Sequence, residues 1–236
     1  MASVKVSDKD VQYILTDKSG KFIVTKTTKF NSAKNQFSVK REVYPDGLKA
    51  KENLLEEGIT VSNVGYLQIN KEKVPALRPK LSRYLIWLDG KKYYSEIKIN
   101  VSKKIITVDK SSPEDKWNGV ETFKIPEHKG IFCFYNQLIE CVKTTGFFRK
   151  SAEKEAGSIS IQLIWDGYPY IHEQYEGASS ELFTVATMNF ESISKDGFIN
   201  YSLNFDDQVI FFQVSKEGVL IKQDWISQEF SLKKSN

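Results

Sequence analysis

Apolar residues recur at helical spacing in one long stretch of the chain, residues 125–146. They form a stripe that covers about a third of the helix surface. The stripe consists of Ile131, Phe132, Tyr135, Leu138, Ile139 and Val142. Pro126 before it and Gly146 after it are residue types found at helix starts and ends. The pattern predicts a helix over about residues 128–145 with one face to bury.

Leu138 lies in the middle of this stripe, and Asn136 lies about 160° away around the helix axis. We therefore expect Leu138 to be the most buried residue of the helix and Asn136 to face water.

Most of the remaining chain alternates between apolar and polar residues with a period of two, which predicts strands with one buried face. The clearest hairpin spans residues 83–101, where Asp89 and Gly90 supply the turn. Residues 71–80 contain two prolines and are predicted to form a loop. The predicted strands cover residues 11–16, 21–30, 36–43, 59–70, 83–88, 92–101, 104–108, 119–125, 158–165, 168–175, 182–190, 198–205, 208–214 and 219–226.

The turns between these strands are short, and short turns join antiparallel neighbours. A single sheet of about a dozen strands must curl, and its concave side must be filled. The sequence therefore predicts a mainly β fold: a strongly curved antiparallel sheet, as a half-barrel, spiral or barrel, wrapped around one central α-helix. We expect a single β domain over residues 11–228, a flexible lead over 1–10 and a C-terminal tail over 229–236.

The charges of the 236-residue chain nearly cancel, with 34 basic and 30 acidic residues interspersed along it. A nucleic-acid-binding protein usually concentrates basic residues, so no nucleic-acid partner is expected. No run approaches the roughly 18 apolar residues of a transmembrane segment. The motifs of serine hydrolases, zinc proteases and P-loop proteins do not occur. The sequence therefore predicts a protein that is not an enzyme and holds no cofactor or metal.

The two cysteines, Cys133 and Cys141, both fall within the predicted helix. Eight positions along a helix correspond to about 12 Å, which is farther than a disulfide reaches. We therefore expect two unpaired cysteines that serve as buried apolar side chains.

Two sets of residues have the composition of metal sites. His128 and His172 are the only histidines, and a long stretch of chain separates them. Asp89, Glu96 and Lys98 follow the order of a magnesium-dependent nuclease triplet. The simpler interpretation is that Asp89 is a turn residue and that Glu96 and Lys98 lie on the solvent-exposed face of an amphipathic strand. A magnesium-dependent nuclease is therefore a remote alternative.

Four segments between residues 83 and 226 carry a resemblance to known proteins: the strand ending at 123–126, the helical run 134–139, the loop 146–148 and the hairpin at 163–167. Their order resembles a group of bacterial cell-envelope proteins built as a β half-barrel or β-spiral around a helix. These are related in architecture to periplasmic lipoprotein carriers. The resemblance implies a concavity that holds acyl chains or peptide-like apolar groups. It also implies a periplasmic or outer-membrane-associated location after removal of a leader, while a cytoplasmic location stays open.

The surplus of aromatic residues indicates where such a ligand would lie. The strand 208–214 is apolar on both faces, which suggests that something covers both sides. The predicted ligand-binding residues are Phe132, Tyr135, Leu138, Phe147, Phe148, Phe211 and Phe212. The leading hypothesis is an envelope protein that binds a lipid or lipoprotein acyl chain between sheet and helix. The alternative is a structural module with a fully packed core that binds an envelope protein partner. A cavity of several hundred Å³ favours the first.

Overall fold

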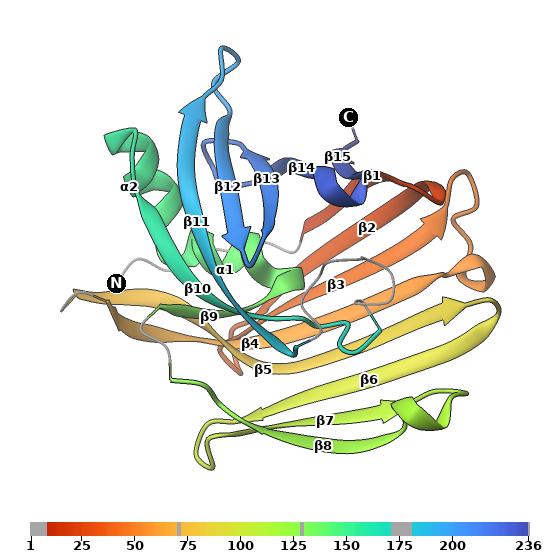
Figure 1. Ribbon diagram of the computed structural model, residues 1–236. Helices are drawn as coiled ribbons and strands as arrows, with labels where there is room; N and C mark the ends of the chain where they lie inside the picture. The colour runs from red at the N-terminus through yellow and green to blue at the C-terminus, as the bar shows by residue number, and fades with distance from the viewer. Residues whose placement is uncertain (1–8, 70–71, 128–129, 171–180, 236) are drawn as a thin grey trace.

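The computed structural model describes residues 9–69, 72–127, 130–170 and 181–235, and fifteen strands within these ranges form one sheet (Figure 1). The first eight strands lie side by side in chain order, and each is antiparallel to the next, joined to it by a short connection or by a loop that contains a single 3₁₀ turn. They are β1 (Lys9–Asp17), β2 (Gly20–Asn31), β3 (Gln36–Pro45), β4 (Glu56–Ile69), β5 (Glu72–Leu88), β6 (Lys91–Asn100), β7 (Ile105–Ser111) and β8 (Gly119–Lys124).

The second half of the sheet is hydrogen-bonded to the first through two strands, one from each end of the chain. Its strands are β9 (Ile131–Phe134), β10 (Ser158–Ile164), β11 (Phe183–Ile193), β12 (Ile199–Phe205), β13 (Gln208–Val214), β14 (Leu220–Trp225) and β15 (Phe230–Lys234). β15 pairs with β1, so that Tyr13 lies opposite Lys234. The order across the sheet is β8-β7-β6-β5-β4-β3-β2-β1-β15-β14-β13-β12-β11-β10-β9. β9 and β10 are parallel, and the other neighbours that the structure describes are antiparallel.

The helical segments are shorter than the sequence pattern predicts. Two α-helices are described, α1 (Leu138–Thr144) and α2 (Phe147–Lys154), separated by Gly146 with its positive φ of 77°. Single 3₁₀ turns occur at η1 (Lys51–Asn53), η2 (Asp115–Trp117), η3 (Tyr135–Gln137) and η4 (Ile226–Gln228).

The prediction of one helix over 128–145 is therefore wrong in its first half. Residues 131–134 are apolar at every position, so they suit a strand as well as a helix. Pairing with β10, in which Ile131 lies opposite Ile161, makes them strand β9. Residues 128 and 129 lie outside the described part of the chain.

The expectation that Leu138 is the most buried residue of the helix is wrong, although Leu138 does lie in the core. Leu138 is 2% exposed, although Val142 in the next turn is more deeply buried. Asn136 belongs to η3, and its side-chain nitrogen is buried. The expectation that Asn136 faces water is therefore wrong, because the helix on which it rested begins only at residue 138.

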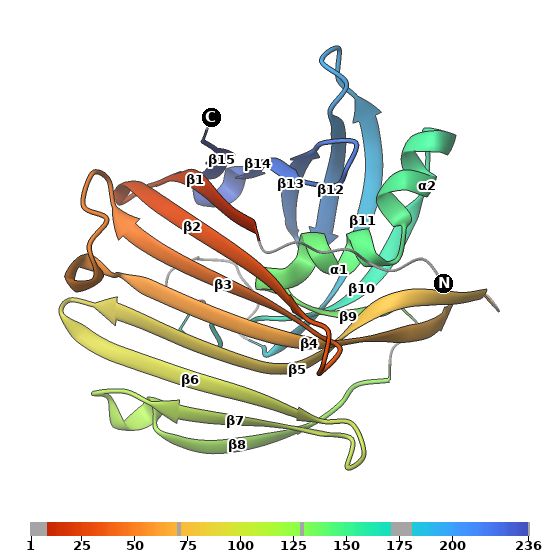
Figure 2. The ribbon, with the colours of Figure 1, turned by 180° about the vertical axis from the view of Figure 1, so that it is seen from behind.

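The sheet curls so that its second half covers the concave face of the first. Figures 1 and 2 show β2–β8 as a broad curved layer, β10–β13 rising across it, and α1 between the two. The mainly β fold and the curved sheet of the prediction are confirmed, but two short helices replace the single central one.

The sheet does not close into a barrel. Its edge strands, β8 and β9, are not hydrogen-bonded to each other. Side chains pack across the opening instead, where Phe123 of β8 contacts Phe183 of β11 at a ring-centroid distance of 6.2 Å. Ile97 and Ile106 from the first half share a buried cluster with Phe134 from the second. The architecture is a barrel-like sheet held together at its opening by apolar contacts.

Three buried hydrogen bonds fix η3 and α1 to the concave face. The Gln137 side chain is 1% exposed and accepts a hydrogen bond from the Ser62 hydroxyl. Its amide nitrogen donates to the carbonyl oxygens of Thr60, at 3.1 Å, and Phe37, at 3.5 Å. Because these partners lie on β3 and β4, Gln137 sets where α1 rests on the sheet.

Two segments predicted as irregular are strands. Residues 72–80 belong to β5, with Pro75 opposite Tyr66 and Pro79 opposite Ser62 of β4. The pairing of β5 with β6 begins only at Leu81. Proline is tolerated on this part of β5, because its missing N–H would face no partner. The expected tail over 229–236 contains β15, which pairs on both of its sides.

Gln137→Met should lower the free energy of unfolding by about 1–3 kcal/mol. The substitution keeps the volume of the side chain but leaves the Ser62 hydroxyl and the Thr60 carbonyl without their partner. Urea unfolding measures the loss. Gln12→Ala, at an exposed site on β1, is the control and should change stability by less than about 0.5 kcal/mol. Equal midpoints for the two variants would contradict the anchoring role of Gln137.

Candidate functional site

The space between α1 and the concave face contains a cavity of about 390 Å³, which we call the outer chamber. Ligand pockets run from roughly 300 to 1,000 Å³, so the outer chamber can hold a small ligand. It is bounded by strands β1–β5, by α1 and by the turn that leads into β14. Its lining residues are Lys9, Val11, Tyr13, Lys26, Thr28, Phe30, Phe37, Val64, Leu77, Ile139, Glu140, Lys143, Thr144, Gly218, Val219 and Leu220.

The outer chamber has apolar walls and a positively charged rim. Lys26 is paired with Glu140 of α1 at 2.9 Å. Lys9 and Lys143 are exposed, and neither forms an ion pair within the described part of the chain. Although Lys143 reaches solvent, part of its side chain is buried. This partial burial, followed by the charge of Lys9, holds the pKa of Lys143 below its usual value, against the charges of Glu140 and Glu217. The two lysines therefore form a positive site beside an apolar cavity.

Lys143 is held in place by a close approach of the backbone. Gly218 has φ +70°, and a Cβ atom on it would lie 3.1 Å from Lys143 Cδ and 3.2 Å from a ring carbon of Phe148. Glycine at this position therefore lets the stem of Lys143 lie against the turn before β14.

A smaller cavity of about 80 Å³, the inner chamber, adjoins the outer one. The two chambers share Tyr13, Lys26, Ile139 and Leu220 in their linings. The remaining residues of the inner chamber are Val24, Arg41, Glu56, Gly58, Tyr84, Tyr135, Asn136, Leu138, Asp166, Gly167, Phe212, Gln223, Trp225, Phe230 and Leu232. The second half of the sheet thus covers this chamber.

The inner chamber contains polar groups that are already paired. Arg41 of β3 forms an ion pair with Glu56 of β4, which is 6% exposed. Gln223 of β14 donates to the Tyr135 hydroxyl at 2.7 Å. These contacts satisfy the charge of Arg41 and the oxygen of Tyr135 within the protein.

Asp166 and Asn136 are only partly satisfied. The backbone N–H of Asn136 donates to Asp166 Oδ2 at 2.6 Å. Asp166 Oδ1 and Asn136 Nδ2 are both buried, and neither has a hydrogen-bond partner in the structure as described. Burial raises the pKa of Asp166 to about 7, against the opposing effects of the Asn136 N–H and the charges of Arg41 and Lys26.

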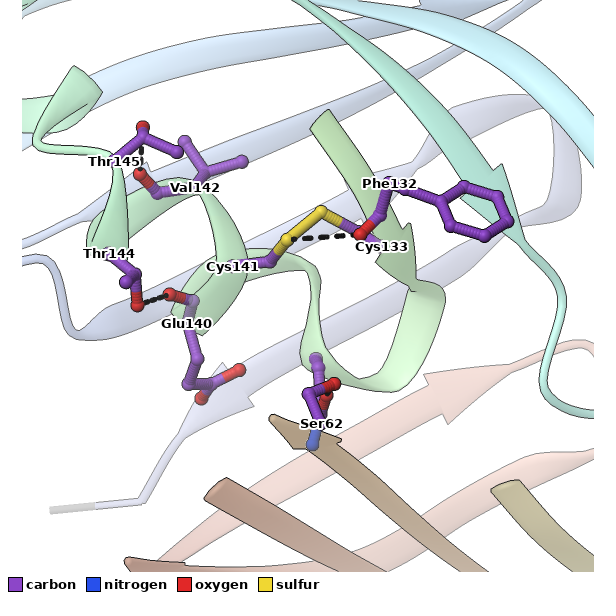
Figure 3. Close-up of a disulfide and its surroundings, with 9 residues drawn as sticks. Ser62, Phe132, Cys133, Glu140, Cys141, Val142, Thr144 and Thr145 are labelled. Carbon is purple, nitrogen blue, oxygen red and sulfur yellow. Dashed lines mark hydrogen bonds between the residues drawn. A yellow bond between two sulfur atoms is a disulfide. The ribbon is translucent and has the colours of Figure 1, made fainter. Parts of the chain in front are cut away.

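A disulfide between Cys133 and Cys141 holds this region to the sheet (Figure 3). Cys133 lies on β9 and Cys141 on α1, and the chain folds back through η3, which brings the Cα atoms to 6.1 Å. Cys141 Sγ also lies 3.8 Å from the Phe132 carbonyl oxygen. The expectation of two unpaired cysteines is wrong, because it depended on a helix that contained both of them.

The predicted ligand-binding residues are spread over several parts of the molecule. Tyr135, Leu138 and Phe212 line the inner chamber, and none of the seven lines the outer chamber. Phe132 packs against Phe183 beside the sheet opening. Phe147 and Phe148 pack on Tyr201.

Phe211 lies on the outer face of β13 and is 42% exposed. The interpretation of β13 as covered on both faces is therefore wrong, since Ile210, Phe212 and Val214 are its buried side.

Sequence reasoning missed the polar residues of both chambers. Asp166 precedes a glycine and fits the pattern of a turn residue, which it also is. Lys143 fits the last turn of a helix, where a basic residue is common. Only their positions in space identify them as members of a site.

The alternative metal sites are not assembled in the described structure. Asp89 lies in the turn before β6 and Glu96 seven residues along the chain, which corresponds to roughly 20 Å in a strand. Glu96 is paired with Arg83, at 2.6 Å, and with Lys98. No group of three metal-ligating side chains occurs in the described part of the chain, and His128 and His172 lie outside it.

Comparison with known proteins finds similarity to a solved structure but to no family model or curated protein. No family model matches it, and no curated protein does. The chain is similar to the crystal structure of a β-barrel-like protein of the domain of unknown function DUF1849 from Brucella abortus, with 11% sequence identity and a TM-score of 0.49. The match covers 99% of this chain and 97% of that one. Among the described helices, none has the length and apolar character needed to cross a membrane.

Removal of the disulfide by Cys133→Ser with Cys141→Ser should lower the free energy of unfolding by about 2–3 kcal/mol. That is the loop-entropy figure for a bridge closing a loop of this length. Denaturant unfolding of the double variant against the oxidised wild type measures it. Addition of a reductant should destabilise the wild type equally and leave the variant unchanged. If a reductant also destabilised the double variant, the loss of stability in the wild type could not be attributed to the disulfide.

Asp166 should make the protein less stable as the pH rises from about 4 to about 7. Its pKa is about 7 when folded and about 4 when unfolded, so the native state binds a proton that the unfolded state has released. The contribution, up to about 4 kcal/mol at 1.36 kcal/mol per pKa unit, is complete below pH 4 and lost above pH 7. Asp166→Asn removes it. Unfolding of both proteins at pH 5 and pH 8 tests this, and identical pH dependence would contradict it.

Proposed function

We propose that this protein binds an anionic amphiphile, such as a fatty acid, without converting it chemically. The apolar chain of the ligand lies in the outer chamber, and its acidic head group lies at Lys9 and Lys143. The observation that carries the proposal is a cavity of ligand size with apolar walls and two lysines at its rim that form no ion pair in the described structure.

The walls of the outer chamber favour an apolar chain. Val11, Phe30, Phe37 and Leu77 from four different strands face Ile139 of α1 across the cavity. Apolar surface of this kind gains roughly 25 cal/mol for each Å² that a ligand removes from water. The acyl chain expected from the resemblance is one ligand that fits.

The rim favours a negative head group. Because the charge of Lys9 acts on Lys143, the two ammonium groups repel each other, and an anion placed between them relieves the repulsion. Glu140 and Glu217 also act on Lys143, but Glu140 is paired with Lys26, and neither forms an ion pair with Lys143 in the described structure. A fatty-acid carboxylate and a lipid phosphate share the required chemistry.

The disulfide supports a location outside the cytosol, such as the bacterial periplasm. Structural disulfides persist in oxidising compartments and are rare in the cytosol. The alternative function, a module with a fully packed core, is less well supported, because the interior holds two chambers. The exposed apolar residues Val209 and Phe211 on β13 are a surface that such a module could use.

Thr28→Trp should weaken the binding of dodecanoic acid at least tenfold, because the indole fills the outer chamber from its rim. Displacement of a fluorescent fatty acid from lipid-free protein measures the affinity. Thr27→Trp is the matched control, because adjacent residues of a strand point to opposite faces and Thr27 is outside the chamber lining. Equal affinity for the two variants, or no binding by the wild type, would overturn the proposal.

The head-group assignment is tested by charge reversal. Lys9→Glu with Lys143→Glu should reduce the affinity for dodecanoic acid at least tenfold and leave the affinity for dodecanol within about threefold. Lys18→Glu with Lys34→Glu changes the net charge equally at exposed turn positions and should affect neither ligand. An equal loss of both ligands in the first variant would show that the lysines do not recognise the acid.

A further inference from the structure

A third cavity, of about 190 Å³, lies beyond the inner chamber, and we call it the end pocket. Its lining residues are Leu15, Asp17, Ser19, Phe22, Val43, Leu55, Glu56, Ile86 and Trp87. Ser19 belongs to the turn between β1 and β2 and is exposed, so the end pocket reaches the surface at the end of β1 opposite to Lys9. Its volume is below the range of roughly 300–1,000 Å³ that is usual for ligand pockets. The end pocket is therefore too small for a whole ligand and large enough for a part of one.

The three cavities follow one another along the inward faces of β1 and β2. Alternate residues of a strand share one face of the sheet. On β1, Val11 lines the outer chamber, Tyr13 lines both chambers and Leu15 lines the end pocket. The antiparallel β2 gives the same order in reverse, with Thr28 in the outer chamber, Lys26 in both chambers, Val24 in the inner chamber and Phe22 in the end pocket.

The inner chamber and the end pocket meet at Glu56 of β4, which lines both of them. Val43 and Ile86 lie directly opposite Glu56 on the neighbouring strands, and both line the end pocket. Val24, which lines the inner chamber, lies directly opposite Val43. The two cavities are therefore neighbours on one face of the sheet, with only side chains between them.

We infer that one long anionic amphiphile occupies all three cavities. Its acidic head group lies at the lysine rim, its chain runs through the outer and inner chambers, and its apolar end lies in the end pocket beside Trp87. This inference rests on the proposed function and adds the length and direction of the ligand to it. Lys9 and Asp17, at the two ends of the path, are eight residues apart on β1, or about 26 Å in a strand. A path of this length suits a long-chain fatty acid.

The walls favour an apolar chain along the whole path. In the inner chamber they include Val24, Leu138 and Phe212. In the end pocket the apolar side chains are Leu15, Phe22, Val43, Leu55, Ile86 and Trp87. Each methylene group that is buried against such walls gains roughly 0.8 kcal/mol, so a chain that reaches the end pocket binds more tightly than one that stops in the outer chamber.

Two ion pairs lie beside the path, and both are formed within the protein. Lys26, at the boundary between the two chambers, is paired with Glu140. Arg41 is paired with Glu56, at the boundary between the inner chamber and the end pocket. An apolar chain that passes these boundaries therefore meets charges that already have partners.

The charged residues at the two ends set the direction of the ligand. Those that line the end pocket are Asp17 and Glu56, and both are acidic. A carboxylate in the end pocket would face Asp17, whereas at the other end of the path it meets Lys9 and Lys143. The head group therefore lies at the lysines, and the apolar end of the chain lies in the end pocket.

Leu55→Trp tests the length of the site, because Leu55 lines the end pocket and neither chamber. Leu55 is only partly buried, so the indole fills the end pocket from its edge. The affinity for eicosanoic acid, which has 20 carbons, should fall at least tenfold, and that for dodecanoic acid should stay within threefold. Leu54→Trp is the matched control, because Leu54 is also partly buried and lines none of the three cavities. It should leave both affinities within threefold, as measured by isothermal titration calorimetry.

The direction of the ligand is tested by tryptophan fluorescence, since a bromine atom quenches an indole that it contacts. Eicosanoic acid with bromine on its terminal carbon should quench Trp87, and the same acid with bromine on its second carbon should not. The contribution of Trp87 is the difference between the wild type and Trp87→Phe, which separates it from that of Trp225 in the inner chamber.

The outcomes separate this inference from the proposed function. If dodecanoic acid binds and Leu55→Trp leaves the affinity for eicosanoic acid unchanged, the inference is overturned and the proposed function stands. Binding of neither acid by the wild type would overturn both. An equal loss of both acids in Leu55→Trp, or no quenching of Trp87 by the terminal bromine, would also overturn the inference.

Discussion

The structure depends on covering the concave face of a fifteen-stranded sheet. α1 has seven residues and is about 10 Å long, so it covers only a small part of that face. The second half of the sheet folds across the first and covers much of the rest. The two chambers lie where strands, helix and returning sheet fail to meet. A short helix in a long sheet is thus the physical origin of the candidate site.

The buried polar groups of this interior are of two kinds: some have all their hydrogen-bond partners, and others lack one. Gln137 finds partners on β3 and β4 and fixes the helix to the sheet. Asp166 and Asn136, the residue before Gln137 in η3, each keep an atom without a partner in the described structure. An unpaired buried group costs free energy, which a packed apolar residue would avoid. Gln137 therefore stabilises the packing of the helix on the sheet, whereas the unpaired atoms of Asp166 and Asn136 lower the stability of the same interior.

The sequence allowed the strands to be predicted and the site to be found only in part. Period-two alternation identified hairpins such as β5–β6, because one buried face leaves a clear pattern. It failed at residues 131–134, where four successive apolar residues fit the period of a strand and that of a helix equally well. Because the segment was assigned to a helix, the disulfide between Cys133 and Cys141 was not predicted. The aromatic residues chosen as ligand contacts include Phe211, which is exposed because β13 has an outer face. Asp166 gave only the signal of a turn, since its burial depends on strands distant in the chain.

The pairing of β1 with β15 also governs the order in which the sheet can form. These neighbours lie roughly 220 residues apart in sequence, so their contact carries a large loop-closure entropy and a high contact order. During synthesis β1 can complete its hairpin with β2 at once, but its other edge stays open until β15 has left the ribosome. An exposed strand edge can pair with another chain. The interval before β15 arrives is therefore the period in which a nascent chain most needs protection from aggregation.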